Sequence, residues 1–201
     1  MAAETPQIGV LILAGGEATR LPNKLTLAAG DVPMIVRVYR NTSAGRVTFI
    51  STRTTFPPEI DALLDCPMVV DRWARRGPLC GMLSAMPEMP TPLVFAVAGD
   101  APLIDAAFIE RVAQAWRPGD EAVVPARLRD GREQLEPLAA LYDRRAFLRE
   151  GPPVLEDGDG GVLSVLARLR VRKIALDPAD AERVLVNVNT PSEYAALAER
   201  L

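Results

Sequence analysis

Histidine is absent from this sequence of 201 residues. Its absence excludes histidine metal ligands, histidine general bases and nucleophile pairs of the Ser–His or Cys–His kind. Lysine is almost absent as well, because only Lys24 and Lys173 are lysines among the 23 basic residues. Any chemistry that requires a lysine amine therefore has two candidates.

Cysteine is scarce, and long apolar runs are missing. Cys66 and Cys80 form neither a close metal-binding pair nor a disulfide framework, which favours a reducing compartment. Residues 1–7 carry an acid and no base, unlike a signal peptide. The apolar run Ile8–Ala14 is too short to span a bilayer. We therefore expect a soluble, cytoplasmic protein that does not bind membranes.

The remaining composition is that of a globular protein, with 49% apolar, 24% charged and 5% aromatic residues. A chain of this length can bury about 70% of its unfolded surface and needs no disulfide to fold. The net charge of −3 argues against binding nucleic acid through bulk charge, although a local basic cleft stays open. We expect one domain over residues 1–201 and no nucleic-acid partner.

Strand-like and helix-like segments alternate over the first 116 residues. The expected strands are 8–14, 46–51, 67–70 and 92–98, and the expected helices are 33–41, 78–86 and 105–116. This alternation is typical of βαβ units and a mostly parallel sheet with helices on both faces.

The pattern changes after Gly119. Further strands are expected at 122–125, 134–142 (antiparallel to its neighbours), 171–175 and 184–186, and helices at 144–150, 161–170 and 191–201. Residues 157–161 read as a flexible turn, not a domain linker. The predicted fold is α/β: a three-layer α/β/α, Rossmann-like domain with a mostly parallel mixed sheet.

A glycine pair follows the first expected strand, in the segment Leu13-Ala14-Gly15-Gly16-Glu-Ala-Thr-Arg20-Leu-Pro-Asn-Lys24. It matches neither the dinucleotide fingerprint nor the P-loop. Glycines at a strand end let backbone N–H groups approach a ligand closely, and Arg20 and Lys24 add two positive charges. This combination suits a triphosphate. The alternative is a plain Gly-Gly turn with a solvated arginine and lysine.

The loop resembles the signature of the nucleotidyltransferases with a MobA-like NTP transferase domain, and the molybdenum cofactor guanylyltransferases are the nearest relatives. Four further segments agree in order: Asp71 followed by Gly77-Pro-Leu-Cys-Gly81, Gly99-Asp-Ala-Pro102, Glu136-Pro-Leu-Ala-Ala-Leu-Tyr142 and Asn187-Val-Asn-Thr-Pro191. The resemblance covers nearly the whole chain and implies a Rossmann-like nucleotidyltransferase fold.

The resemblance also implies a reaction, in which GMP passes from GTP to the phosphate of molybdopterin and pyrophosphate is released. It implies Mg²⁺ as cofactor, GTP or another NTP as partner, and transient contact with proteins that mature molybdoenzymes. The catalytic residues would be Arg20, Lys24 and Asp100, and the metal ligands Asp100 and Asn189. The nucleotide would be bound by Leu13, Ala14, Gly15, Gly16, Lys24, Asp71, Gly77 and Asp100.

Simpler interpretations stay open at several of these residues. Asp100 could cap the next segment, because Gly-Asp-Ala-Pro is also good turn chemistry. Asn189 or Thr190 before Pro191 could be an ordinary helix cap. Asp71 could accept from a guanine base, contact a ribose, or pair with one of the arginines at 75 and 76.

Other residues near the motifs are weaker candidates. Cys80 has no histidine to activate it, so a nucleophilic role is not expected. Trp73 could line the acceptor site or only pack, and Trp116 is expected to pack. Arg75, Arg76 and Arg132 could contact an anionic acceptor or simply face solvent.

The sequence departs from the family pattern in three places: Pro22-Asn23 replaces glycines in a shortened loop, Ala98-Gly99 stands where a cysteine is usual, and Thr52-Arg53 where an asparagine is usual. Transfer from CTP, or to another phosphorylated acceptor, therefore stays an alternative. So does a nucleotide-binding regulator that has lost turnover.

Overall fold

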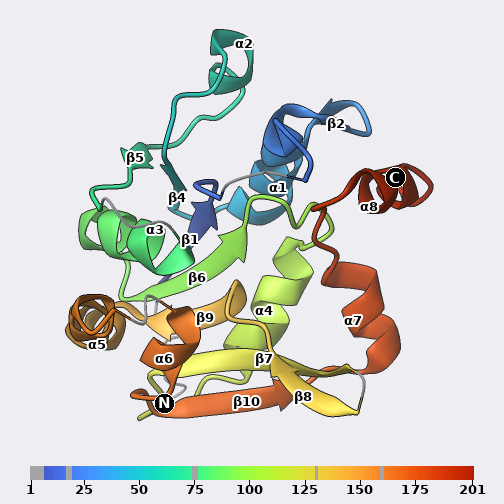
Figure 1. Ribbon diagram of the computed structural model, residues 1–201. Helices are drawn as coiled ribbons and strands as arrows, with labels where there is room; N and C mark the ends of the chain where they lie inside the picture. Colours follow the sequence, from blue (N-terminus) through green and yellow to red (C-terminus); the bar gives the residue numbers. More distant parts are fainter. Residues whose placement is uncertain (1–6, 17–19, 74–76, 130, 159–160) are drawn as a thin grey trace.

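The computed structural model describes residues 7–16, 20–73, 77–129, 131–158 and 161–201. A central sheet runs through it in the order β10-β7-β9-β6-β1-β4-β5, with β8 paired to β7 (Figure 1). The strands are β1 Ile8–Leu13, β4 Thr48–Thr52, β5 Met68–Val70, β6 Leu93–Ala98, β7 Ala122–Arg129, β8 Arg132–Leu135, β9 Ala139–Asp143 and β10 Val171–Ala175. Two short strands, β2 Ala28–Ala29 and β3 Val32–Pro33, form a separate antiparallel pair.

The sheet is mixed and mostly parallel, as predicted. β1 pairs in parallel with β4 and β6, β4 with β5, and β10 with β7. Two strands depart from the parallel arrangement: β9 lies antiparallel to both β6 and β7, and β8 lies antiparallel to β7. The carboxyl ends of β1, β4, β5 and β6 consequently meet at one edge.

Helices cover both faces of the sheet (Figure 1). On one face, a core forms around α1 Met34–Ser43, α4 Ala106–Gln114 and α7 Pro178–Val184. On the other, a second core forms around α3 Pro78–Ala85, α5 Arg144–Glu156 and α6 Val162–Leu166. Val10 and Ile12 of β1 point into the first core and Leu11 into the second. Burial on both faces explains why this strand is almost continuously apolar, and the predicted three-layer arrangement is confirmed.

Short helices complete the fold. α2 Pro58–Asp61 follows β4, and the 3₁₀ helices η1 Lys24–Thr26 and η2 Met86–Glu88 follow β1 and α3. α8 Pro191–Ala198 packs through Leu197 on a small cluster that includes Leu21, Ala29 and Val188. α8 thereby lies against the loop that carries Lys24.

Several boundaries differ from those predicted. The strand predicted at 134–142 is divided into β8 and β9, because Pro137 has no N–H for the ladder and the chain turns there. The prediction of a strand at 184–186 was wrong, because α7 ends at Val184 and no strand follows in these residues. Val184 and Leu185 are apolar because they are buried in the first core. α5 runs to Glu156, beyond the predicted end at residue 150, with Val154 and Leu155 buried in the second core. The turn predicted at 157–161 lies partly outside the described residues.

Among the residues that the structure describes, no helix has both the length and the apolar character needed to cross a membrane.

Candidate active site

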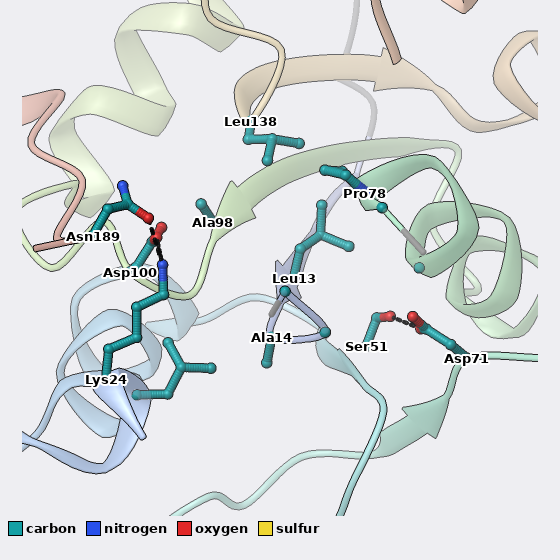
Figure 2. A pocket seen from close by; sticks show the side chains of 15 residues that line it. Leu13, Ala14, Lys24, Ser51, Asp71, Pro78, Ala98, Asp100, Leu138 and Asn189 are labelled. Carbon is teal, nitrogen blue, oxygen red and sulfur yellow. Dashed lines mark hydrogen bonds and ion pairs between the residues drawn. The ribbon is translucent and has the colours of Figure 1, made fainter. Parts of the chain in front are cut away.

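A cavity of about 240 Å³ lies at the edge where the parallel strands end (Figure 2). Its walls come from the loop after β1, the ends of β4 and β6, the segment after β5, the start of α3 and the segment before α8. The lining residues are Leu13, Ala14, Gly15, Gly16, Lys24, Leu25, Ser51, Asp71, Gly77, Pro78, Gly81, Ala98, Asp100, Leu138 and Asn189. Every residue predicted to bind nucleotide or metal is among them, so the structure brings these residues together.

Three side chains meet at one end of the cavity, as Figure 2 shows. Lys24 Nζ donates to Asn189 Oδ1 at 2.7 Å and forms an ion pair with the Asp100 carboxylate. The side chains of Lys24 and Asp100 are only 12% and 13% exposed. This enclosure strengthens their electrostatic interaction relative to that of a surface pair.

Backbone hydrogen bonds fix the segments that carry these groups. Gly99 N donates to the Leu13 carbonyl at 2.9 Å, which ties the Asp100 loop to the end of β1. Val188 N donates to the Asp100 carbonyl at 3.0 Å, which ties the segment before α8 to the same loop. The positions of Asp100 and Asn189 are therefore set by main-chain contacts on both sides.

The same end of the cavity has the donor set for a magnesium ion. The Asp100 carboxylate and the Asn189 amide oxygen both reach the Lys24 ammonium, so a cation at that point would contact both oxygens. Mg²⁺ in phosphate-binding sites commonly takes one or two carboxylates and completes its shell with phosphate oxygens and water. Within the described residues no cluster of three acidic, histidine or cysteine side chains is present. The residues at this point fit that sparse kind of site.

Asn189 does not provide the side-chain cap of α8. That cap is formed by Thr190, whose Oγ1 accepts from Glu193 N at 3.3 Å, while the Glu193 carboxylate accepts from the backbone N–H groups of Asn189 and Thr190 at 2.8 and 2.9 Å. The hydrogen bond from Asn189 N is the main cause that lowers the pKa of Glu193. The capping box thus holds the Asn189 backbone and leaves its side chain directed at Lys24.

Arg20 lies apart from the cavity-lining residues. It is exposed, and its charge is close enough to Glu193 to contribute to the lowering of that carboxyl's pKa. The predicted cluster of cations therefore has Lys24 inside the cavity and Arg20 outside it, near the start of α8.

Asp71 lies at the opposite end of the cavity, directly after β5 (Figure 2). Its Oδ1 accepts from Ser51 Oγ of β4 at 2.6 Å. A methyl group added at Gly15 would stand 2.9 Å from Asp71 Oδ2, and one added at Gly81 would stand 2.6 Å from Ser51 Oγ. A side chain at Gly15 would press on the Asp71 carboxylate and one at Gly81 on its partner Ser51, whereas a methyl group added at Gly16 would meet open space.

The weaker candidates are divided by the structure. Cys80 is buried and forms no disulfide, which fits a packing role. Trp73 is 38% exposed and is not among the residues that line the cavity, and Arg132 is exposed on β8. Arg75 and Arg76 lie outside the described residues, so their predicted pairing with Asp71 is not described either.

The sequence did not single out Ser51 or Leu25, although both line the cavity, and it noted Ala98 and Leu138 only as members of longer motifs. Leu138 belongs to the Glu136–Tyr142 motif, in which Tyr142 is fully buried and donates to the Pro137 carbonyl at 2.7 Å. That hydrogen bond holds the turn that presents Leu138, which is a structural reason for part of the motif.

Comparison with known proteins supports the resemblance to nucleotidyltransferases that the sequence motifs indicate. The fold superimposes on the crystal structure of molybdopterin-guanine dinucleotide biosynthesis protein A from Archaeoglobus fulgidus with a TM-score of 0.78 and 20% identity, covering 96% of this chain and 97% of that one. The two proteins therefore share one fold. The MobA-like NTP transferase domain matches residues 10–174, and the chain belongs to that family.

Relatives of known sequence agree with this assignment. The molybdenum cofactor guanylyltransferase of Burkholderia ambifaria (strain MC40-6) is 30% identical over 207 aligned positions, covering 99% of each chain. A protein of Bacillus licheniformis, named as a probable molybdenum cofactor guanylyltransferase, is 35% identical over 127 residues, which are 62% of each chain.

Proposed function

We propose that this protein is a Mg²⁺-dependent guanylyltransferase that transfers GMP from GTP to the terminal phosphate of a molybdopterin-type acceptor. The observation that carries the proposal is the meeting of Lys24, Asp100 and Asn189 beside the Gly15–Gly16 loop, from three distant parts of the chain. Membership of the MobA-like family and the names of the full-length relatives support the same reaction.

The reaction requires alignment and charge neutralisation more than a protein nucleophile. An oxygen of the acceptor phosphate attacks the α-phosphorus of GTP, the bond from the α-phosphorus to the bridging oxygen breaks, and pyrophosphate leaves with the electron pair. Lys24, inside the cavity, stabilises the negative charge that grows on the leaving diphosphate. Arg20 does the same from the rim of the loop. The missing histidine is no obstacle to this chemistry.

Asp100 and Asn189 would hold the magnesium ion. When bound, Mg²⁺ would add its positive charge to that of Lys24 and so neutralise phosphate oxygens during transfer. Asn189 contributes a neutral oxygen, so the protein adds only one negative charge to a site that must also accept a triphosphate. Leu13 to Gly16 line the cavity between this end and Asp71, which would contact the nucleoside.

Two alternatives give different results in one experiment. A related cytidylyltransferase would prefer CTP, and a regulator that has lost turnover would bind nucleotide without chemistry. The presence of Lys24, Asp100 and Asn189 in one contact network favours catalysis over a regulator. A cytoplasmic location and transient contact with molybdoenzyme-maturation proteins belong to the same proposal.

The test is pyrophosphate release by the purified protein with Mg²⁺, molybdopterin and each of the four NTPs in turn. We expect release with GTP that depends on both Mg²⁺ and acceptor. Release with CTP alone would replace the guanylyltransferase by a cytidylyltransferase. Nucleotide binding without release under any combination would favour the regulator.

A further inference from the structure

Ser51 and Asp71 form a polar pair, in which Ser51 is buried on β4 and Asp71 is half-buried directly after the neighbouring parallel strand β5. Ser51 is 1% exposed in β4, and its Oγ donates to Asp71 Oδ1 at 2.6 Å. The backbone N–H of Asp71 also donates to the Thr52 carbonyl at 2.9 Å. Both the main chain and the side chain of Asp71 are therefore attached to β4.

The surrounding backbone narrows the space for this carboxylate. The Gly81 backbone lies beside Ser51 Oγ and Asp71 Oδ1, and the Gly15 backbone lies beside Asp71 Oδ2. The carboxylate thus occupies a slot between two glycines, with Oδ1 towards Ser51 and Oδ2 towards the Gly15–Gly16 loop at the cavity. The short hydrogen bond from Ser51 Oγ to Asp71 Oδ1 restrains the orientation of the carboxylate in this slot.

We propose that Ser51 is a positioning residue that orients Asp71 to read the guanine base of the nucleotide, an inference that rests on the proposed function. An ionised carboxylate only accepts hydrogen bonds, and its two oxygens offer about four acceptor positions, of which Ser51 uses one. Guanine presents two adjacent donors, N1–H and the 2-amino group, which match the two oxygens. Cytosine presents N3 and O2 acceptors at the corresponding edge, which a carboxylate repels.

The experiment measures nucleotide binding by titration calorimetry without acceptor, for GTP, ITP, CTP and 2′-deoxy-GTP. ITP is the informative probe because its base lacks only the 2-amino group. We expect the wild-type protein to prefer GTP to ITP and to CTP. Ser51→Ala should weaken GTP binding by about tenfold and ITP binding less, since a misplaced carboxylate loses most where it makes two bonds.

A double-mutant cycle separates positioning from packing. Asp71→Asn should lose the preference for GTP over ITP, and Ser51→Ala in that background should cause little further loss, because Ser51 acts through Asp71. Thr48→Ala is the control, since Thr48 is also a buried hydroxyl residue on β4 but bonds to the Arg46 carbonyl. Its GTP-to-ITP ratio should match the wild type. Ser51→Cys, a weak donor, replaces Ser51→Ala if the alanine variant does not fold.

Three results would overturn the inference. The first is a Ser51→Ala protein whose ratio of GTP affinity to ITP affinity is unchanged, and the second is additive losses of GTP affinity in the double variant. The third is a change in affinity that appears only between GTP and 2′-deoxy-GTP, which would assign Asp71 to the ribose. Turnover is not needed for this measurement. Selective GTP binding controlled by Ser51 without pyrophosphate release would support the inference while contradicting the proposed function.

Discussion

Lys24 and Asn189 are separated by 165 positions in the chain, yet the lysine Nζ lies 2.7 Å from the asparagine Oδ1. The same ammonium contacts the Asp100 carboxylate. The lysine therefore occupies the point on which both oxygens converge, and this arrangement leads to predictions about catalysis, metal binding and folding.

Loss of either charged partner should remove most of the catalysis. We expect Lys24→Ala and Asp100→Ala each to lower the turnover number for pyrophosphate release by at least ~100-fold, the effect of removing one preorganised electrostatic group. Lys173→Ala is the matched control, because the other lysine lies exposed on β10 and pairs with Glu133. Near-normal turnover by a correctly folded Lys24 or Asp100 variant would show that its assigned role is wrong.

Lys24 and a divalent cation should compete for Asp100 and Asn189 in the absence of nucleotide. Lys24→Gln removes a positive charge from beside the carboxylate, so we expect tighter binding of Mn²⁺, used as a spectroscopic substitute for Mg²⁺. Electron paramagnetic resonance measures the concentration of unbound Mn²⁺ in the titration. Asp100→Asn in the same background should abolish the gain, and weaker Mn²⁺ binding by Lys24→Gln would contradict the competition.

The adjacent residues Asn189 and Thr190 should have different roles, metal binding for Asn189 and capping of α8 for Thr190. Thr190→Ala removes the side-chain cap of α8 and should lower the free energy of unfolding by about 1 kcal/mol. Asn189→Ala leaves the cap and should instead weaken Mn²⁺ binding and turnover. Urea unfolding and activity, measured on both variants, check the division. If Asn189→Ala only destabilised the protein, the asparagine would be a structural residue.

Acid should loosen α8 through Glu193. The pKa of this carboxyl lies below its ordinary value of 4.5, chiefly because it accepts from Asn189 N. Its contribution to stability is therefore complete above the unfolded-state pKa and is lost as the pH falls through the lower folded-state pKa. The free energy of unfolding of the wild type should fall more steeply below about pH 5 than that of Glu193→Gln. Parallel curves for the two proteins would exclude this contribution.

The fold could be predicted largely from the sequence because each inner strand is buried on both faces. Ile8–Leu13 and Leu93–Ala98 are therefore continuous apolar runs that indicate parallel strands. Periodicity was misleading where burial had another cause, as at Val184 and Leu185, which are apolar because they pack against the first core.

The site was predictable only in part. A strand-end loop with glycines, arginine and lysine indicates phosphate binding, and the family resemblance added Asp71, Asp100 and Asn189. Ser51 was not found, because a serine inside a strand carries no sign of its partner. The sequence also could not show which of Asn189 and Thr190 caps α8, since both residue types are common caps. The hydrogen bonds of Glu193 distinguish the two residues in the structure.

The contacts of the last helix bear on how the protein is made. Tyr194 Oη donates to the Ala28 carbonyl at 2.7 Å, and Val188 N donates to the Asp100 carbonyl, so the segment around α8 joins parts of the chain that are synthesised much earlier. A ribosome-bound chain can form β1, β4 and β6 while Asn189 is still untranslated. The site therefore reaches its final form only after the segment around α8 has been synthesised and has docked on the Lys24 and Asp100 loops.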